Sequence, residues 1–271
     1  MNLTIENLTK TFRGKKALDI ERYIVHSGEV VGLVGNNGAG KTTLFRIVLD
    51  LLKADSGYVK IGGEIAGRPF SCDTSRSEDW KSYTGAFIDT GFLIDYLTPE
   101  EYFRFLAKIT GIGDRSLAER LAHFECFMNG EIIGRKTLIR NLSMGNKQKV
   151  GIIGAMLHYP QLLILDEPFN FLDPTSQLTM KYLLESYAKE QRATIIVSSH
   201  NLIHTLDICN RITLLEQGRI IKDYDRDYAL LTSEIEAYYA DLEKELGDRV
   251  KIVRYEGNFN YSAVNNLGAG Y

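Results

Sequence analysis

The sequence has few cysteines and prolines and lacks any long apolar run. Only 3 of its 271 residues are cysteine and 5 are proline. Cys72, Cys126 and Cys209 are far apart and form no CxxC pair, which argues against a disulfide framework or a zinc site and favours a reducing compartment. The amino-terminal stretch lacks the basic start and apolar run of a signal peptide. The apolar stretches at 150–157 and 162–165 fall far short of the roughly 20 residues that span a membrane, so we expect no transmembrane helix.

Neither sign of charge dominates the sequence. Lysine and arginine number 32, and aspartate and glutamate number 35, for a formal net charge of −3. This balance argues against a strongly basic nucleic-acid-binding protein. Hydrophobic residues make up 44% and charged residues 25%, which is typical of a folded globular protein rather than a disordered one. The length suits one large domain or two small lobes.

Short apolar runs separated by helical patterns predict a parallel α/β core. The predicted buried strands are residues 30–34, 162–165 and 194–198. Helices are predicted over 42–52 and 150–158, and strands joined through helices are parallel in a shared sheet. The pattern over 211–224 predicts a hairpin that turns near Gln217 and Gly218.

Two further regions have a residue pattern that differs from that of the core. Residues 3–8 and 58–61 predict strands of an antiparallel lobe. Residues 78–145 are rich in helix formers and aromatics, which predicts an inserted helical lobe. After residue 225 a charged segment is predicted to be helical, with an amphipathic stretch over 234–246 that packs either on its own domain or on a second copy.

A phosphate-binding motif follows the first predicted core strand. Its residues are Gly35, Asn36, Asn37, Gly38, Ala39, Gly40, Lys41, Thr42 and Thr43, which fit G-x4-G-K-[ST]. The glycines let successive N–H groups turn toward phosphate oxygens, and the helix amino terminus adds unpaired donors. We expect Lys41 to contact the β- and γ-phosphates, Thr42 to hold Mg²⁺ and Thr43 to reach the α-phosphate. The motif therefore predicts a nucleotide site.

Polar residues stand at the ends of the next two core strands. Asp166 and Glu167 follow the run at 162–165, and His200 follows the run at 194–198. An α/β sheet binds its ligands at the carboxyl ends of its strands. We therefore expect Asp166 near Mg²⁺ and Glu167 near the water that attacks the γ-phosphate. His200 is expected to donate to the γ-phosphate and sense its loss.

The order of these motifs resembles that of the ATP-binding cassette ATPases of ABC transporters. Between the phosphate loop and Asp166 lies the sequence Leu-Ser-Met-Gly-Asn at 142–146. The resemblance covers about residues 2–224, leaves 225–271 as a carboxy-terminal extension, and is nearest to bacterial exporter cassettes of the bacitracin and lantibiotic resistance type. It implies an α/β P-loop NTPase fold with a mainly parallel core sheet, an antiparallel β lobe and an inserted α-helical lobe at about 78–145.

The resemblance also implies roles for residues outside the phosphate loop. Phe12 matches the aromatic that stacks on adenine, although a strand-end core residue is the alternative. Ser143 and Gly145 match the signature LSGGQ, which contacts the γ-phosphate of ATP bound to the opposite subunit. Residues 170–173 match the loop that crosses the dimer interface. Asp89 stands where the family usually has a glutamine that touches Mg²⁺, and it is either a metal ligand or an exposed loop acid.

Three further positions depart from the family pattern. Met144 replaces the first signature glycine and Asn146 replaces the signature glutamine. Backbone N–H donors survive both changes, so we expect function with altered packing. Phe171 lies in the interface loop where small residues are common, which predicts a tighter or shifted dimer contact.

Taken together, the resemblance implies an ATPase subunit with ATP and Mg²⁺ as its ligands. Two cassettes, as a homodimer or heterodimer, would close around two Mg·ATP and drive a separate integral membrane subunit, as in an exporter. The chain would then be cytoplasmic and lie at the inner face of the membrane through that partner. The aromatics between 89 and 105 form either a groove for a helix of the membrane subunit or part of the core; they are Phe92, Tyr96, Tyr102, Phe103 and Phe105.

Three other functions stay open at this point. A soluble member of the same family that acts on nucleic acid or the ribosome usually joins two cassettes or carries a long coiled coil, whereas this sequence has one phosphate loop and no sustained heptads. A phosphate-loop small-molecule kinase would lack a signature before the second carboxylate strand. A nucleotide-gated structural module without turnover would have no need of Glu167.

Overall fold

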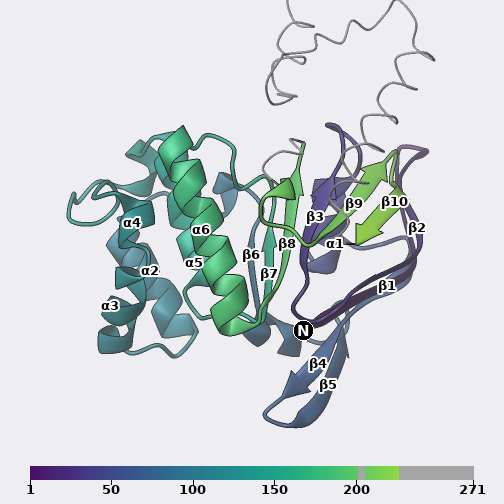
Figure 1. Cartoon of the computed structure of the whole chain (residues 1–271), viewed down its shortest axis with the longest axis horizontal. Helices are drawn as coiled ribbons and strands as arrows, with labels where there is room; N and C mark the ends of the chain where they lie inside the picture. The colour runs from purple at the N-terminus through teal and green to yellow at the C-terminus, as the bar shows by residue number, and fades with distance from the viewer. Residues whose placement is uncertain (201–204, 226–271) are drawn as a thin grey trace, which may run out of the picture.

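The computed structural model describes residues 1–200 and 205–225. The predictions for the segment after residue 225, including the amphipathic stretch 234–246, lie outside the described residues. Within the described ranges, no helix is both long enough and apolar enough to cross a membrane. The described part contains two sheets and the helices that pack on them (Figure 1).

The larger sheet has six strands in the order β10-β9-β3-β8-β7-β6. The strands are β3 (Val30–Val34), β6 (Thr84–Phe87), β7 (Leu162–Leu165), β8 (Thr194–Ser199), β9 (Arg211–Glu216) and β10 (Arg219–Asp225). All neighbours pair in parallel except β9 and β10, which form an antiparallel hairpin. The predicted parallel core and the hairpin that turns at Gln217 and Gly218 are confirmed.

The smaller sheet is antiparallel, with the order β2-β1-β4-β5. Its strands are β1 (Asn2–Phe12), β2 (Lys15–Val25), β4 (Ser56–Ile65) and β5 (Arg68–Asp73). The predicted strands at 3–8 and 58–61 are the central parts of β1 and β4, which pair with each other. Arg13 and Gly14 join β1 to β2 in a turn where both residues have positive φ.

Helices cover both faces of the larger sheet. The helices of the described residues are α1 (Lys41–Val48), α2 (Pro99–Ile109), α3 (Asp114–Ala122), α4 (Glu125–Met128), α5 (Met144–Met156) and α6 (Pro174–Gln191), with short 3₁₀ turns η1 (Asp79–Tyr83), η2 (Thr90–Phe92) and η3 (Ile139–Asn141). Figure 1 shows α2, α3 and α4 grouped at one side, beyond α5 and α6. Helix α5 begins six residues before the predicted start at 150.

The predicted helical lobe at 78–145 is not helical from its start. Residues Thr84–Phe87 form β6, the outermost strand of the larger sheet beside β7. The α-helices of this region begin only at Pro99, where Thr98 caps α2 through a reciprocal bond with Glu101. The strand escaped prediction because it has only four residues, Thr-Gly-Ala-Phe, with little apolar character, and its partner β7 lies far along the chain.

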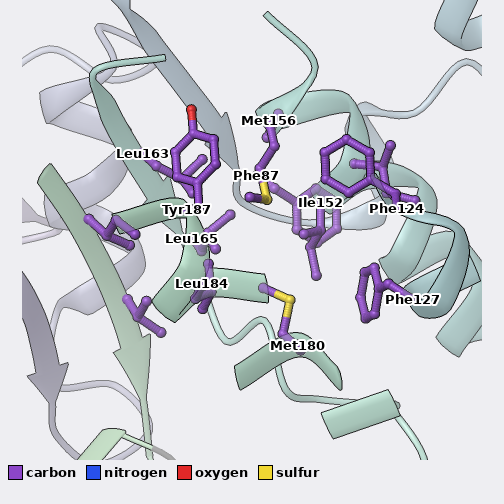
Figure 2. Packing of buried hydrophobic residues seen from close by; sticks show 14 of the residues in the cluster. Phe87, Phe124, Phe127, Ile152, Met156, Leu163, Leu165, Met180, Leu184 and Tyr187 are labelled. Carbon is purple, nitrogen blue, oxygen red and sulfur yellow. The ribbon is translucent and has the colours of Figure 1, made fainter. Parts of the chain in front are cut away.

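Strand β7 is apolar throughout because it is covered on both faces. Leu163 and Leu165 pack into a cluster with α5 and α6, where Met156 and Leu184 lie close to them (Figure 2). Leu162 and Ile164 face a second cluster that includes α1 and the antiparallel lobe. The strand is therefore fixed between two cores, and its carboxyl end, where Asp166 and Glu167 follow, is held in place.

Candidate functional site

The phosphate-binding motif connects the end of β3 to the start of α1, as predicted. Gly40, the residue before α1, has φ 112°, and an added Cβ there would lie 2.8 Å from the Ala17 carbonyl oxygen. At Gly35 an added Cβ would lie only 2.2 Å from the Leu215 carbonyl oxygen. Both positions therefore exclude other residue types. Since Gly40 has no side chain with which to cap α1, the helix amino terminus faces the loop with its donors.

Lys41 is buried inside this loop. Its side chain is 6% exposed, and its ammonium donates to the Gly35 carbonyl at 2.5 Å. Glu167 lies 3.4 Å away through Oε1 and supplies the opposite charge. A buried ammonium paired in this way has its charge fixed at the centre of the loop, where anionic groups of a ligand would meet it.

Thr42 and Asp166 meet at the other side of the loop. The Thr42 hydroxyl donates to Asp166 Oδ2 at 2.6 Å, and the Ser198 hydroxyl donates to Asp166 Oδ1. Burial raises the pKa of Asp166, and the bonds from Ser198 and Thr42 oppose that rise only in part. The contact joins α1, β7 and β8 at one edge of the sheet.

This donor set fits Mg²⁺ that is shared with a phosphate ligand. A hydroxyl and one carboxylate oxygen lie within 2.6 Å of each other, both oxygen donors of the kind Mg²⁺ prefers. In the residues that the structure describes, no group of three or more His, Cys, Asp or Glu side chains forms a complete metal site. Since Mg²⁺ in nucleotide sites takes one or two protein ligands and fills the rest with phosphates and water, the pair is sufficient.

Glu167 and His200 form a coupled pair beside Lys41. His200 Nδ1 lies 2.8 Å from Glu167 Oε2, and the His200 backbone N–H donates to the same oxygen at 3.3 Å. Burial of Glu167 opposes its ionisation, but the bond from His200 and the charge of Lys41 outweigh it and lower the pKa of Glu167. The bond to Glu167 in turn raises the pKa of His200. Glu167 is thus held as a carboxylate.

The predicted signature residues begin α5. Ser143 is the amino-terminal cap, and its hydroxyl accepts from the Asn146 N–H at 3.2 Å. An added Cβ on Gly145 would lie 2.6 Å from the Phe171 carbonyl oxygen, so the signature packs directly on the loop at 170–173. Met144 and Phe171 are both exposed. This helix start and this loop present one exposed surface.

Two predicted site residues lie outside the polar network. Phe12 ends β1 with 45% of its surface exposed, and the Lys10 ammonium lies 5.5 Å from its ring centre. The Asp89 carboxylate accepts from the Gly91 N–H at 2.6 Å and lies 3.5 Å from the Arg46 guanidinium. In this structure Asp89 therefore caps η2 and pairs with α1, and its metal role stays a prediction.

Two residues of the site were missed in the sequence. Ser198 connects both acids, because its hydroxyl donates to Asp166 and accepts from the Glu167 N–H at 2.9 Å. Gln148 on α5 donates through Nε2 to the Glu167 carbonyl oxygen at 3.1 Å. Ser198 could have been found from the sequence, because it is a hydroxyl residue at the end of an apolar strand, two residues before His200. For Gln148 the sequence offers no local signal.

A groove opens between β6, η2, α2 and α5. Its volume is about 280 Å³, and Phe92, Leu93, Tyr102 and Leu106 are among its lining residues. Of the aromatics that predicted either a groove or a core, Phe103 is fully buried, whereas Phe92 and Tyr96 are exposed at 56% and 74%. Phe103 is therefore part of the core, Phe92 lines the groove, and the docking of a membrane-subunit helix there stays a prediction.

Comparisons with known proteins agree with this geometry. A family model described as ABC transporter matches residues 19–170. The bacitracin transport ATP-binding protein BcrA of Bacillus licheniformis is 33% identical over 251 residues, which cover 91% of this chain and 76% of that protein. BcrA of Enterococcus faecalis is 31% identical over 80% of this chain and 67% of that protein.

Solved structures show the same fold. A structure of the ATP-binding subunit of an ABC transporter has a TM-score of 0.71 and 27% identity, covering 89% of this chain and 99% of that one. A dimeric ATP-binding cassette bound to ADP and Pi has a TM-score of 0.68 and 24% identity, covering 82% and 98%. The family match and the sequence similarity to ATP-binding proteins of transporters favour a transporter subunit over a protein that acts on nucleic acid or the ribosome.

Proposed function

The chain belongs to the ABC transporter family as an ATP-binding and ATP-hydrolysing subunit, and we propose that it closes as a dimer around two Mg·ATP molecules and drives a separate membrane subunit. The convergence of Lys41, Thr42, Asp166, Glu167 and His200 at one edge of the sheet is the observation that carries this proposal.

Each residue of the network has a distinct role. The phosphate-loop N–H groups and Lys41 bind the β- and γ-phosphates. Thr42 and Asp166 would hold Mg²⁺, which would supply neutralisation of the phosphate charge. Glu167, with its lowered pKa, is ionised at neutral pH and orients the attacking water. His200 fixes the Glu167 carboxylate through their mutual bond.

The second half of each site comes from the partner cassette. Ser143 and Gly145 stand at the amino terminus of a 13-residue helix, which is suited to an anion. Exposed Met144 and Phe171 beside them supply apolar contact area for the second copy. ATP that is bound by both surfaces stabilises the closed dimer, and hydrolysis removes the shared charge and lets it open.

The membrane subunit docks in the groove beside β6. Phe92 is an exposed aromatic that lines this groove, Tyr96 is a second exposed aromatic four residues further along the chain, and the groove walls are mostly apolar. These features suit a short amphipathic helix from a partner. Through it the chain lies at the cytoplasmic face of the membrane. The similarity to bacitracin transport proteins supports a role in export.

The proposal is tested with the variant Glu167→Gln. We expect it to bind ATP, to dimerise in light-scattering measurements with Mg·ATP, and to release phosphate at less than about a hundredth of the wild-type rate. Wild-type phosphate release in this variant would remove Glu167 from its role.

A further inference from the structure

The backbone of Glu167 is held in an unusual conformation. Its φ is 48°, in the left-handed region that residues with a Cβ rarely adopt. Contacts restrain both of its peptide groups: the N–H donates to Ser198 Oγ at 2.9 Å, and the carbonyl accepts from Gln148 Nε2 and the Asn170 N–H, each at 3.1 Å. The position of the Glu167 carboxylate therefore depends on groups outside its own segment.

Of these groups, only Gln148 belongs to α5, the helix that begins at the signature residues and is called the signature helix below. It lies in the second turn of α5, after Ser143 and Gly145, and it is 4% exposed. A buried amide that gives its N–H to a carbonyl cannot move without leaving a buried group unpaired. The contact of Gly145 with Phe171 adds a second connection between the same helix and the loop that follows Glu167. A shift of α5 is thus transmitted to Glu167.

We propose that Gln148 is a positioning residue that couples the signature motif to Glu167 of the same chain. This inference rests on the proposed dimer. There the signature of one chain contacts the nucleotide held by its partner, whereas Glu167 acts on the nucleotide of its own chain. Gln148 then reports occupancy of one site to the catalytic group of the other, and ATP hydrolysis becomes cooperative.

The molecule offers a matched control in Gln177. Its Nε2 donates to the Phe169 carbonyl at 3.3 Å, in the same loop, but from α6 instead of the signature helix. Gln148→Met and Gln177→Met each replace an amide by an unbranched apolar side chain of similar length. Each removes one side-chain bond to a carbonyl of this loop, so a general loss of loop order affects both alike.

The experiment measures phosphate release against ATP concentration for both variants, together with ATP binding and thermal unfolding. For Gln148→Met we expect kcat to fall on the order of 10- to 100-fold, the ATP dissociation constant to stay within about 2-fold, and the Hill coefficient to drop from above 1 to about 1. For Gln177→Met we expect kcat and the Hill coefficient of the wild type. If Gln148→Met does not fold, Gln148→Asn tests the same bond, because its amide is one methylene too short to reach.

Several outcomes would overturn the proposal. One is a folded Gln148 variant whose kcat and Hill coefficient equal those of the wild type. Another is an equal fall in kcat in the Gln148 and Gln177 variants. A third is a Hill coefficient of about 1 in the wild-type protein itself. Glu167→Gln in the same assay separates this inference from the proposed function. Full ATP turnover in Glu167→Gln would refute the role of Glu167 itself. If Glu167→Gln loses turnover but the Gln148 variant keeps wild-type turnover and cooperativity, only the coupling is refuted.

Discussion

His200 and Glu167 are joined by a bond of 2.8 Å between Nδ1 and Oε2, at the edge of the sheet where β7 and β8 end. The two residues are 33 positions apart in the chain, each follows the end of a strand, and each stabilises the charged form of the other. The contribution of this pair to the free energy of unfolding therefore depends on pH.

We predict that the stabilisation from the His200–Glu167 pair is lost as pH rises. The pKa of His200 is raised in the folded protein, so its contribution is fully present below the ordinary value of 6.5 and disappears as pH passes the raised value. Glu167, with a lowered pKa, contributes above its ordinary value of 4.5 and loses that contribution in acid. Urea unfolding of wild type and His200→Ala checks this. The unfolding free energy of the wild type should exceed that of His200→Ala most between the ordinary pKa values of Glu167 and His200, and this difference should shrink above neutral pH. A difference that grows with pH would contradict the pairing.

Lys41→Ala should abolish ATP binding. Its ammonium is the buried positive charge within the loop, and a methyl group supplies neither charge nor donor. Isothermal titration calorimetry with ATP measures the effect, and Lys81→Ala, an exposed lysine on η1, serves as the control. Unchanged ATP affinity in the Lys41 variant would refute the assignment of the loop.

Ser198→Ala should impair both acids together. It removes a donor to Asp166 and an acceptor for the Glu167 N–H, and it leaves buried groups without partners. We expect the unfolding free energy to fall by about 1–3 kcal/mol and kcat to fall on the order of 10-fold or more. Denaturant unfolding and phosphate release measure the two effects. Ser186→Ala on the exposed side of α6 should change neither, and a Ser198 variant that matched it would disprove the bridging role.

Truncation of the exposed aromatics should separate coupling from hydrolysis. Phe92→Ala combined with Tyr96→Ala removes one side chain that lines the groove and a second exposed aromatic without opening the core, since both side chains are exposed. Basal phosphate release and thermal stability should stay at wild-type values, while association with the membrane fraction falls. Tyr182→Ala, which truncates an exposed tyrosine on α6, provides the control. Equal membrane association of all three proteins would place the docking surface elsewhere.

The core strands and the phosphate loop were predictable from sequence because their signals are local. Strands β3, β7 and β8 are short apolar runs that are buried on both faces, and the acids that follow β7 stand at a strand end. Strand β6 was missed because its four residues carry no such signal. Ser198 and Gln148 act through contacts 31 and 19 residues away, which only the packing of β8 and α5 against β7 creates.

The most direct test of the shared nucleotide site is a crystal structure of Glu167→Gln grown with Mg·ATP. We predict a dimer in which each triphosphate contacts Lys41 of one chain and Ser143 and Gly145 of the other. A triphosphate contacted by one chain alone, with the signature residues facing elsewhere, would contradict the proposed function.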